Sequence, residues 1–256
     1  QKMLSSGDYT TLVSEEYLQS GKPADAVPYT QEQIQKYYEA KEPGYYNTNW
    51  QKMIVRDWAP MQNYNVSLRG GGQNIRYYIF AGTLMQGSFW KKNGGDYKRY
   101  NFQTNVDADV LDNLSLGVTV SNIIDNTNST NRPQNGGGYL FADLYNNKPM
   151  YPSSLPDPDK IPFSGSATGG ALVQSNRDLG GYTDNHFQTF FQSINANYRF
   201  KAIEGLSLKA LGNYTRTNYN QKSYGRPVDL WTYNVDTKEY LLAAQFNANT
   251  PLNQQK

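Results

Sequence analysis

Acidic residues and a single histidine are the side chains that could carry acid–base or metal chemistry in this chain. Asp107 and Asp109 are two residues apart in an alternating segment, so they share a face, as two carboxylates could in a glycosidase. Residues two apart share a face on any strand, and we favour a solvated polar wall. His186 is the only histidine, which excludes a two-histidine metal site within this chain. We therefore predict no enzyme activity, no metal site and no cofactor.

Two weaker patterns could belong to ion or phosphate sites. Asp157-Pro158-Asp159 could be part of a calcium loop, but no EF-hand spacing follows it, so a turn is favoured. The glycine runs at 136–138 and 169–170 lack the strand and helix context of a phosphate loop. The chain has no cysteine, which excludes a disulfide scaffold, a thiolate metal site and a cysteine nucleophile.

Aromatic side chains are the other candidates for binding, because the chain has 22 Tyr, 10 Phe and 4 Trp. Some fall in segments expected to be loops, where the sugar rings of a substrate could stack on them. These candidate substrate-binding residues are Trp90, Tyr139, Tyr151 and Trp231. A second group is interpreted as loop packing, with a sugar-binding or partner-binding surface as the alternative. Its members are Tyr45, Tyr46, Trp50 and Trp58.

The elements that would position these residues are strands with one apolar and one polar face. Polar and apolar residues alternate over 12 positions from Arg99 to Val110. Strands in soluble sandwiches usually hold about 5–6 residues, whereas a membrane strand needs about 9–11. Similar alternation recurs at 62–69, 74–86, 114–121 and 186–215. We predict about six transmembrane strands, with Tyr100, Tyr198 and Phe200 in aromatic girdles near the strand ends.

Connections between these strands alternate between short and long, as in outer-membrane barrels with short periplasmic turns and longer extracellular loops. The glycine run at 70–72 is expected to supply the positive φ angles of one tight turn. Short helices are expected in the loops at 7–19, 31–40, 50–58 and 139–145, with Thr30 as an N-cap. The predicted organisation is an extracellular loop region at 1–61, barrel strands with short periplasmic turns at 62–121, a long extracellular loop at 122–185, barrel strands at 186–218, and an extracellular loop or further strand at 219–256.

The fold class predicted from this pattern is all-β: an antiparallel transmembrane β-barrel segment with long extracellular loops. The net charge of +2 gives no electrostatic case for nucleic acid as a partner. The mean hydropathy is −0.76, and no apolar run is long enough for a membrane-spanning helix. An open sheet edge in lipid leaves backbone groups unpaired, so we expect the chain to be a fragment whose remaining strands lie elsewhere.

Several motifs resemble the SusC-like (RagA-like) TonB-dependent transporters of Bacteroidetes. Asn49-Trp50 precedes a run from Ala59 to Gly71 that is similar to the family pattern N-x-x-W … Q-x-x-x-x-S-x-x-G-G. Further matching segments follow in the family's order and spacing. They are Arg76-Tyr77-Tyr78 with Gly82, Tyr97-Lys98-Arg99-Tyr100-Asn101, Lys148-Pro149-Met150-Tyr151-Pro152 and Gly205-Leu206-Ser207-Leu208-Lys209.

The resemblance implies part of a barrel of about 22 strands in the outer membrane, in contact with outer-membrane lipid. It implies active import of oligosaccharides or peptides, with a SusD-like surface lipoprotein as partner. It also implies coupling to TonB through an N-terminal region that this sequence does not contain. The alternative is a surface β-domain that binds glycans without transporting them, and a glycoside hydrolase is the least favoured interpretation.

Overall fold

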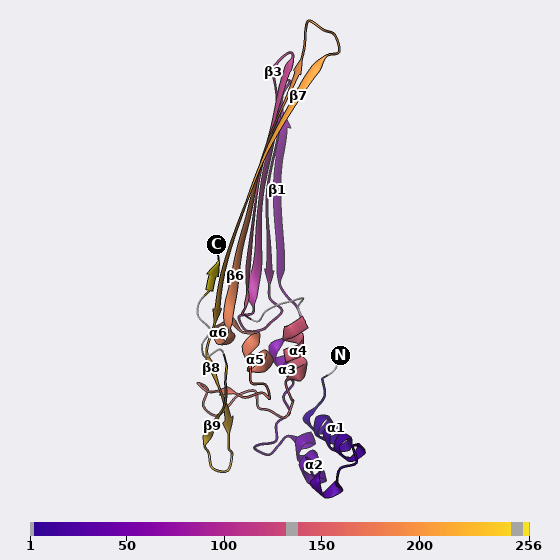
Figure 1. The fold of residues 1–256 in the computed structure, drawn as a ribbon, viewed down its shortest axis with the longest axis vertical. Coiled ribbons are helices and arrows are strands. Elements are labelled where there is room, and N and C mark those ends of the chain that lie inside the picture. The colour runs from indigo at the N-terminus through magenta and orange to yellow at the C-terminus, as the bar shows by residue number, and fades with distance from the viewer. Residues whose placement is uncertain (1–2, 132–137, 247–252, 256) are drawn as a thin grey trace.

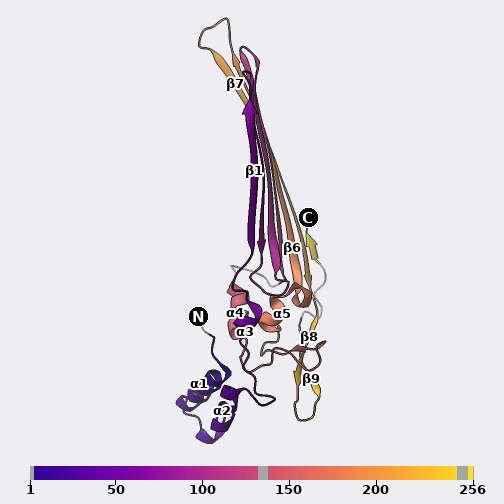
Figure 2. The ribbon, with the colours of Figure 1, turned by 180° about the vertical axis from the view of Figure 1, so that it is seen from behind.

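The computed structural model describes residues 3–131, 138–246 and 253–255, with backbone only for residue 139 and for 253–255. Long strands extend away from a group of helices and short strands at one end (Figure 1). Seen from behind, the strands again stand alone, with no helix alongside them (Figure 2). We call the group at the end of the strands the loop region.

The long strands form one antiparallel sheet in the order β1-β2-β3-β4-β6-β7-β10. No pairing between the edge strands β1 and β10 is seen in the described residues, so the sheet is open there. The C-terminal strand β10 adds to β7, in the part of the chain predicted to be a loop or further strand. The strand bounds are β1 Met61–Gly71, β2 Ile75–Gly87, β3 Gly95–Leu111, β4 Leu114–Thr130, β6 Gly181–Arg199, β7 Ser207–Gly225 and β10 Asn253–Gln255.

The strands reach further into the loop region than their alternation indicated. β4 continues to Thr130, although the pattern ended at Ser121, and β7 continues to Gly225. The segment Asp125–Thr130 contains only Asp, Asn, Ser and Thr, so both faces of the strand are polar there. A strand that is polar on both faces carries no period-2 signal, although its backbone pairing continues.

The expectation that the glycine run of the first hairpin supplies positive φ angles is wrong. None of Gly70, Gly71 and Gly72 is among the described residues with positive φ. Gly70 and Gly71 lie inside β1, where an added Cβ would overlap the Tyr77 ring and the Ile75 carbonyl oxygen. These two glycines are therefore needed for the close approach of β1 and β2 rather than for the turn.

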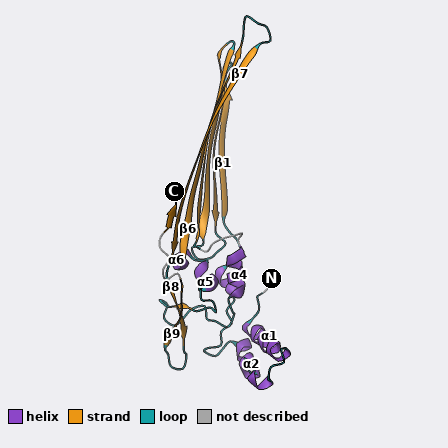
Figure 3. Ribbon diagram, viewed as in Figure 1, coloured by secondary structure: helices purple, strands orange, loops and turns teal. Residues whose placement is uncertain are grey.

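The prediction of an all-β fold is too coarse, because the loop region contains helices (Figure 3). Ser5 and Thr30 cap α1 and α2 with complete capping boxes, so Thr30 is an N-cap as predicted. Within the described ranges, no helix combines the length and the apolar character needed to cross a membrane. The helices are α1 Ser6–Gln19, the 3₁₀ turn η1 Ala24–Ala26, α2 Gln31–Glu39, α3 Trp50–Ile54, α4 Gly138–Asn146, α5 Gly170–Gln174 and α6 Arg177–Gly180.

A small second sheet lies in the loop region, with strand order β5-β8-β9. β5 (Ile161–Pro162) pairs in parallel with β8 (Val228–Tyr233), and β9 (Tyr240–Phe246) pairs antiparallel with β8.

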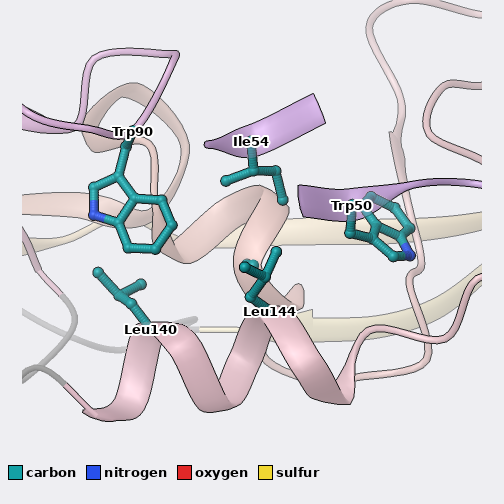
Figure 4. Close-up of a cluster of buried hydrophobic side chains, with 6 residues drawn as sticks. Trp50, Ile54, Trp90, Leu140 and Leu144 are labelled. Atoms are coloured by element: carbon teal, nitrogen blue, oxygen red, sulfur yellow. The ribbon is translucent and has the colours of Figure 1, made fainter. Parts of the chain in front are cut away.

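The buried apolar clusters lie in the loop region and not between layers of the long sheet. The first cluster joins α3, the β2–β3 loop, α4 and α5 (Figure 4). Its members are Trp50, Ile54, Trp90, Leu140, Leu144 and Ala171. A second cluster joins α5 to β8, and its members are Val173, Val228 and Leu230. The long sheet is thus a single layer that emerges from a packed loop region.

Candidate functional site

One face of the long sheet carries an apolar band. Paired residues in an antiparallel sheet point to the same face, so the register assigns every strand residue to a face. The pairs Leu68↔Ile79 and Val106↔Val118 place apolar side chains together in this way. The polar exceptions within the band include Thr104, Asn122 and Gln192. The main members are Tyr64, Val66, Leu68, Ile75, Tyr77, Ile79, Phe102, Val106, Leu116, Val118, Val120, Ile194, Ala196, Leu208, Ala210 and Tyr214.

These apolar side chains are open to solvent in the chain by itself. Val66 is 67% exposed, Leu208 60% and Ile194 58%. Exposed apolar surface on this scale marks a site of contact with protein or membrane.

The edge of the band nearest the loop region is stepped across the sheet. On β2, the apolar residue nearest the loop region is Met85. The residues paired with it across the sheet are Lys98, Asn126, His186 and finally Asn220 on β7. On β7 itself the band already ends six residues before Asn220. Across the sheet, the last apolar residues are Met85 on β2, Tyr100 on β3, Ile124 on β4, Phe190 on β6 and Tyr214 on β7.

The stepped positions of these residues give the angle between the edge of the band and the strands. Six residues correspond to about 20 Å along a strand, and four strand-to-strand steps to about 19 Å across the sheet. The edge of the band therefore runs at about 45° to the strands. The edge strand β1 departs from the trend, with Tyr64 as its last apolar residue.

The opposite face of the long sheet is polar. Arg99 lies 3.6 Å from the Asp125 carboxylate, which also accepts a hydrogen bond from Tyr97. Asp109 accepts a 2.7 Å hydrogen bond from the Ser115 hydroxyl. Asp107 and Asp109 thus belong to this polar wall. The apolar exceptions on this face include Met61, Phe80, Leu84, Ile123, Phe187, Phe191 and Leu211.

The groups considered for acid–base or metal chemistry do not converge. His186 is the sixth residue of β6, and its Nδ1 lies 2.6 Å from the Asn126 side-chain oxygen. Asp157 accepts a 3.0 Å hydrogen bond from the Asp159 backbone N–H, which is turn geometry. No group of three or more His, Cys, Asp and Glu residues suited to a metal is found in the part of the chain that the structure describes.

An aromatic pocket in the loop region brings together two of the four predicted binding residues, Tyr151 and Trp231. The pocket has a volume of about 340 Å³, within the range of small-molecule sites. Its walls come from α2, from the segments around residues 44–46, 150–152 and 163, and from β8. The lining residues are Tyr29, Tyr37, Gly44, Tyr46, Met150, Tyr151, Pro152, Phe163, Trp231, Thr232 and Tyr233.

Hydrogen bonds fix the segment that carries Tyr151. The Trp50 indole N–H donates to the Lys148 carbonyl at 2.9 Å, and the Thr48 hydroxyl donates to the Tyr151 carbonyl at 2.6 Å. The Tyr151 ring packs edge-on against Phe163 with centroids 5.5 Å apart. The buried Trp50 thus contributes to the pocket indirectly, by holding the backbone that precedes Tyr151.

Further backbone contacts fix the Trp231 wall. The Phe163 N–H donates to the Trp231 carbonyl at 2.8 Å, and Pro162 pairs with Trp231 between β5 and β8. Tyr29 and Tyr37 meet edge to face at 6.0 Å on the opposite wall. The pocket is therefore formed by packed elements before any ligand enters it.

The electrostatics of the pocket raise the pKa values of Tyr29 and Tyr37. Burial raises the pKa of the Tyr29 hydroxyl, with a further rise from Tyr9, and the nearby Lys148 opposes this. Burial also raises the pKa of Tyr37, with further rises from Tyr29, Tyr45 and Tyr151. Both hydroxyls stay protonated and can donate or accept hydrogen bonds at neutral pH.

The other two predicted binding residues lie elsewhere. Trp90 is 3% exposed in the first apolar cluster, where it packs on Phe89 and Phe141. The backbone of residue 139 starts the first turn of α4, but the side chain of Tyr139 lies outside the described part of the structure.

Sequence reasoning missed most of the pocket. Tyr29, Tyr37, Tyr46, Phe163 and Tyr233 line it, and Tyr46 was interpreted as loop packing. Each stands in a segment with no motif of its own, and they meet only through tertiary packing. The signals in the sequence that pointed toward such a site are the high tyrosine count and the aromatic residues in expected loops, including Tyr46, for which a sugar-binding surface was the alternative interpretation.

Comparisons with known proteins place the fold. No family model matches the chain, and no curated protein matches it. Two solved structures, of the RagAB peptide transporter and of the RagAB peptide importer in its closed–closed state, match with TM-scores of 0.58. Each is 16% identical to this chain, and each match covers 87% of this chain and 26% of the other. The chain thus spans about a quarter of the matched transporter chains, and its open antiparallel sheet resembles part of the RagA barrel.

Proposed function

We propose that this chain is a segment of the wall and the outer loops of an outer-membrane β-barrel importer. The observation that carries the proposal is the apolar band with its oblique edge. Strands of transmembrane barrels tilt by about 35–45° from the membrane normal. A horizontal membrane boundary would then cross successive strands at stepped positions, as the edge from Met85 to Tyr214 does.

The height of the band supports the same proposal. On β4 the outward apolar residues run from Leu114 to Ile124, about 33 Å along the strand. A tilt of about 45° reduces this to a height of about 23 Å, close to the roughly 25 Å apolar band of outer-membrane barrels. Tyr100, Phe190 and Tyr214 stand at its upper edge, and Tyr198 stands near its lower edge, where aromatic girdles belong.

This orientation assigns the parts of the chain. The short turns face the periplasm, the polar face lines the lumen, and the loop region lies outside the cell. Residues 62–121 and 186–218 contain the membrane-spanning strand segments. Residues 1–61, 122–185 and 219–256 belong mainly to the extracellular side, apart from the strand extensions and β10.

The activity that fits such a wall is TonB-dependent uptake of oligosaccharides or peptides, and not an enzymatic reaction. The similar structures are named as peptide transporters and contain a second component, RagB, in the RagAB complex. By analogy, a SusD-like lipoprotein would partner the extracellular loops, and TonB would act through a region outside this chain. The remaining barrel strands would come from the same full-length protein.

The test uses the full-length protein in lipid vesicles, with spin labels on single cysteines at three outward-facing positions. Met85→Cys and Asn220→Cys lie in the same register row, whereas Tyr214→Cys lies six residues away from Asn220 along β7. We expect Met85→Cys and Tyr214→Cys to report equal depth and Asn220→Cys to contact water. Because the segment has no native cysteine, any background cysteine comes from the rest of the protein.

Two outcomes would contradict the proposal. Equal depth for Met85→Cys and Asn220→Cys would mean that the strands are not tilted as inferred. Full water access at all three positions, in a protein that needs no detergent, would favour the alternative of a surface β-domain that binds glycans.

A further inference from the structure

We propose that the aromatic pocket between α2 and β8 binds an uncharged sugar unit of an oligosaccharide. This inference deepens the proposed function by naming a substrate class, and it rests on that function only in placing the pocket at the cell surface.

The walls combine ring faces with hydroxyl groups. Trp231, Phe163 and the tyrosines supply apolar faces, and Thr232 adds one more hydroxyl to those of the tyrosines. A sugar ring has the complementary surface, because its C–H groups form apolar faces and its rim carries hydroxyls. Tyrosine and threonine hydroxyls can donate and accept, so they can satisfy a hydroxyl in either role.

The lining carries no formal charge among the described residues that form it. Two lysines outside the lining interact with residues that form it. The Lys160 ammonium lies 4.1 Å from the centroid of the Trp231 ring and 3.9 Å from the Asp157 carboxylate. Lys148 acts on Tyr29 from a distance.

These charges argue against the charged ligand classes. A cationic ligand would find no carboxylate in the lining, and Lys160 already lies over the Trp231 ring that could attract it. An acidic sugar or a free peptide terminus would find no charged partner in the lining, and burying a charge without a partner is costly. A neutral ligand avoids both costs.

The pocket is also preorganised, so binding would need little ordering of the protein. The Tyr151 wall is held by Thr48 and Trp50, and the Trp231 wall by β5. Gly44, with φ of 91°, approaches the β8–β9 hairpin, where an added Cβ would lie 4.0 Å from the Val235 side chain. The loop after α2 therefore closes against the hairpin and completes the pocket.

The experiment measures binding of the detergent-purified full-length protein to an array of neutral oligosaccharides, acidic oligosaccharides and proline-rich peptides. The best neutral binder is then titrated against three variants. Trp231→Ala removes a ring face and should weaken binding more than tenfold. Tyr233→Phe removes one hydroxyl and should weaken it about three- to tenfold. Tyr240→Phe lies outside the lining and is the matched control, expected to bind as the native protein does.

Each outcome bears on the inference. Neutral-sugar binding that falls in Trp231→Ala and Tyr233→Phe but not in Tyr240→Phe supports it. No neutral binder on the array, or a pocket-dependent preference for acidic sugars or proline-rich peptides, overturns it. Heat-modifiable gel migration of each variant shows that the barrel is intact, and the conservative Tyr233→Phe variant keeps the test valid if Trp231→Ala does not fold. The spin-label depths test the membrane proposal separately, so the failure of one is distinguishable from the failure of the other.

Discussion

Val118 offers the most direct test of the membrane band by substitution with a charge. The band on β4 runs from Leu114 to Ile124, so its midpoint falls at Thr119, and Val118 is the outward-facing neighbour of that midpoint. One residue of a strand tilted by about 45° corresponds to about 2 Å of depth, which puts Val118 close to the bilayer midplane. An arginine facing lipid at the midplane of a barrel costs about 2–4 kcal/mol. Val118→Arg should therefore destabilise the folded barrel by that amount.

Two nearby substitutions serve as controls for Val118→Arg. Thr119→Arg places the same charge one residue away on the polar face, where water would solvate it. Asn126→Arg places it on the outward face above the band, where the expected cost is about 0–1 kcal/mol. Both should be much less destabilising than Val118→Arg.

The assay is urea titration of the full-length protein in lipid vesicles, with the fast-migrating unboiled band on a gel as the measure of folding. Val118→Arg should lower the urea midpoint, and the two control variants should leave it nearly unchanged. Equal losses at Val118 and Thr119, or a greater loss at Thr119, would refute the assignment of the two faces. No loss at Val118 would refute its lipid contact.

Trp50→Phe keeps an apolar ring but loses the indole hydrogen bond to the Lys148 carbonyl, so it should destabilise the loop region by about 1 kcal/mol. An unchanged denaturation midpoint would show that this hydrogen bond does not stabilise the loop region. Gly95→Ala should cost more, since its φ of 99° disfavours a side chain and an added Cβ would overlap the backbone of β4; a native-like melting temperature would contradict this. The pKa values of Tyr29 and Tyr37 are raised in the folded protein, so these two side chains ionise at lower pH in the unfolded chain than in the folded one. The free energy of unfolding should therefore fall as pH rises above about 10. Denaturant titration between pH 8 and 11 measures this fall in the free energy of unfolding. A free energy of unfolding that stays constant over this range would contradict the prediction.

The strands could be predicted from sequence wherever one face is apolar and the other polar. From Arg99 to Val110 the alternation identifies both the strand and its faces. The alternation is interrupted at Asn122 and disappears beyond Ile124, because Asp125–Thr130 is polar on both sides while its backbone remains paired. The sequence pattern therefore identifies the part of each strand that has one apolar face, and it misses the polar extension toward the loop region.

The start of α2 was predictable from local capping, whereas α5 and α6 (in the predicted long loop) and the pocket were not. Thr30 and Gln33 satisfy each other's backbone donors, so the start of α2 is encoded within four residues. The pocket joins α2 to residue 151 and to β8, which begins 189 residues after α2 ends, and no local rule links such segments. Trp231 and Tyr151 are aromatic residues in expected loops, where sugar rings could stack on them, and Trp90 shows that the same criterion also selects a core residue.

The location of the apolar clusters has a consequence for how the strands are aligned. Alternation of faces rejects a slip of one residue between neighbouring strands, but a slip of two residues leaves every side chain on its correct face. The first cluster gathers α3 before β1, Trp90 between β2 and β3, and α4 after β4. Val55 bridges Trp90, and the Arg177 N–H before β6 donates to the Asn93 carbonyl at 3.0 Å. The packing of the loop region thus fixes the register in which successive strands pair. Weakening this core should therefore produce sheets in which neighbouring strands pair out of register by even numbers of residues, before it produces unfolded protein.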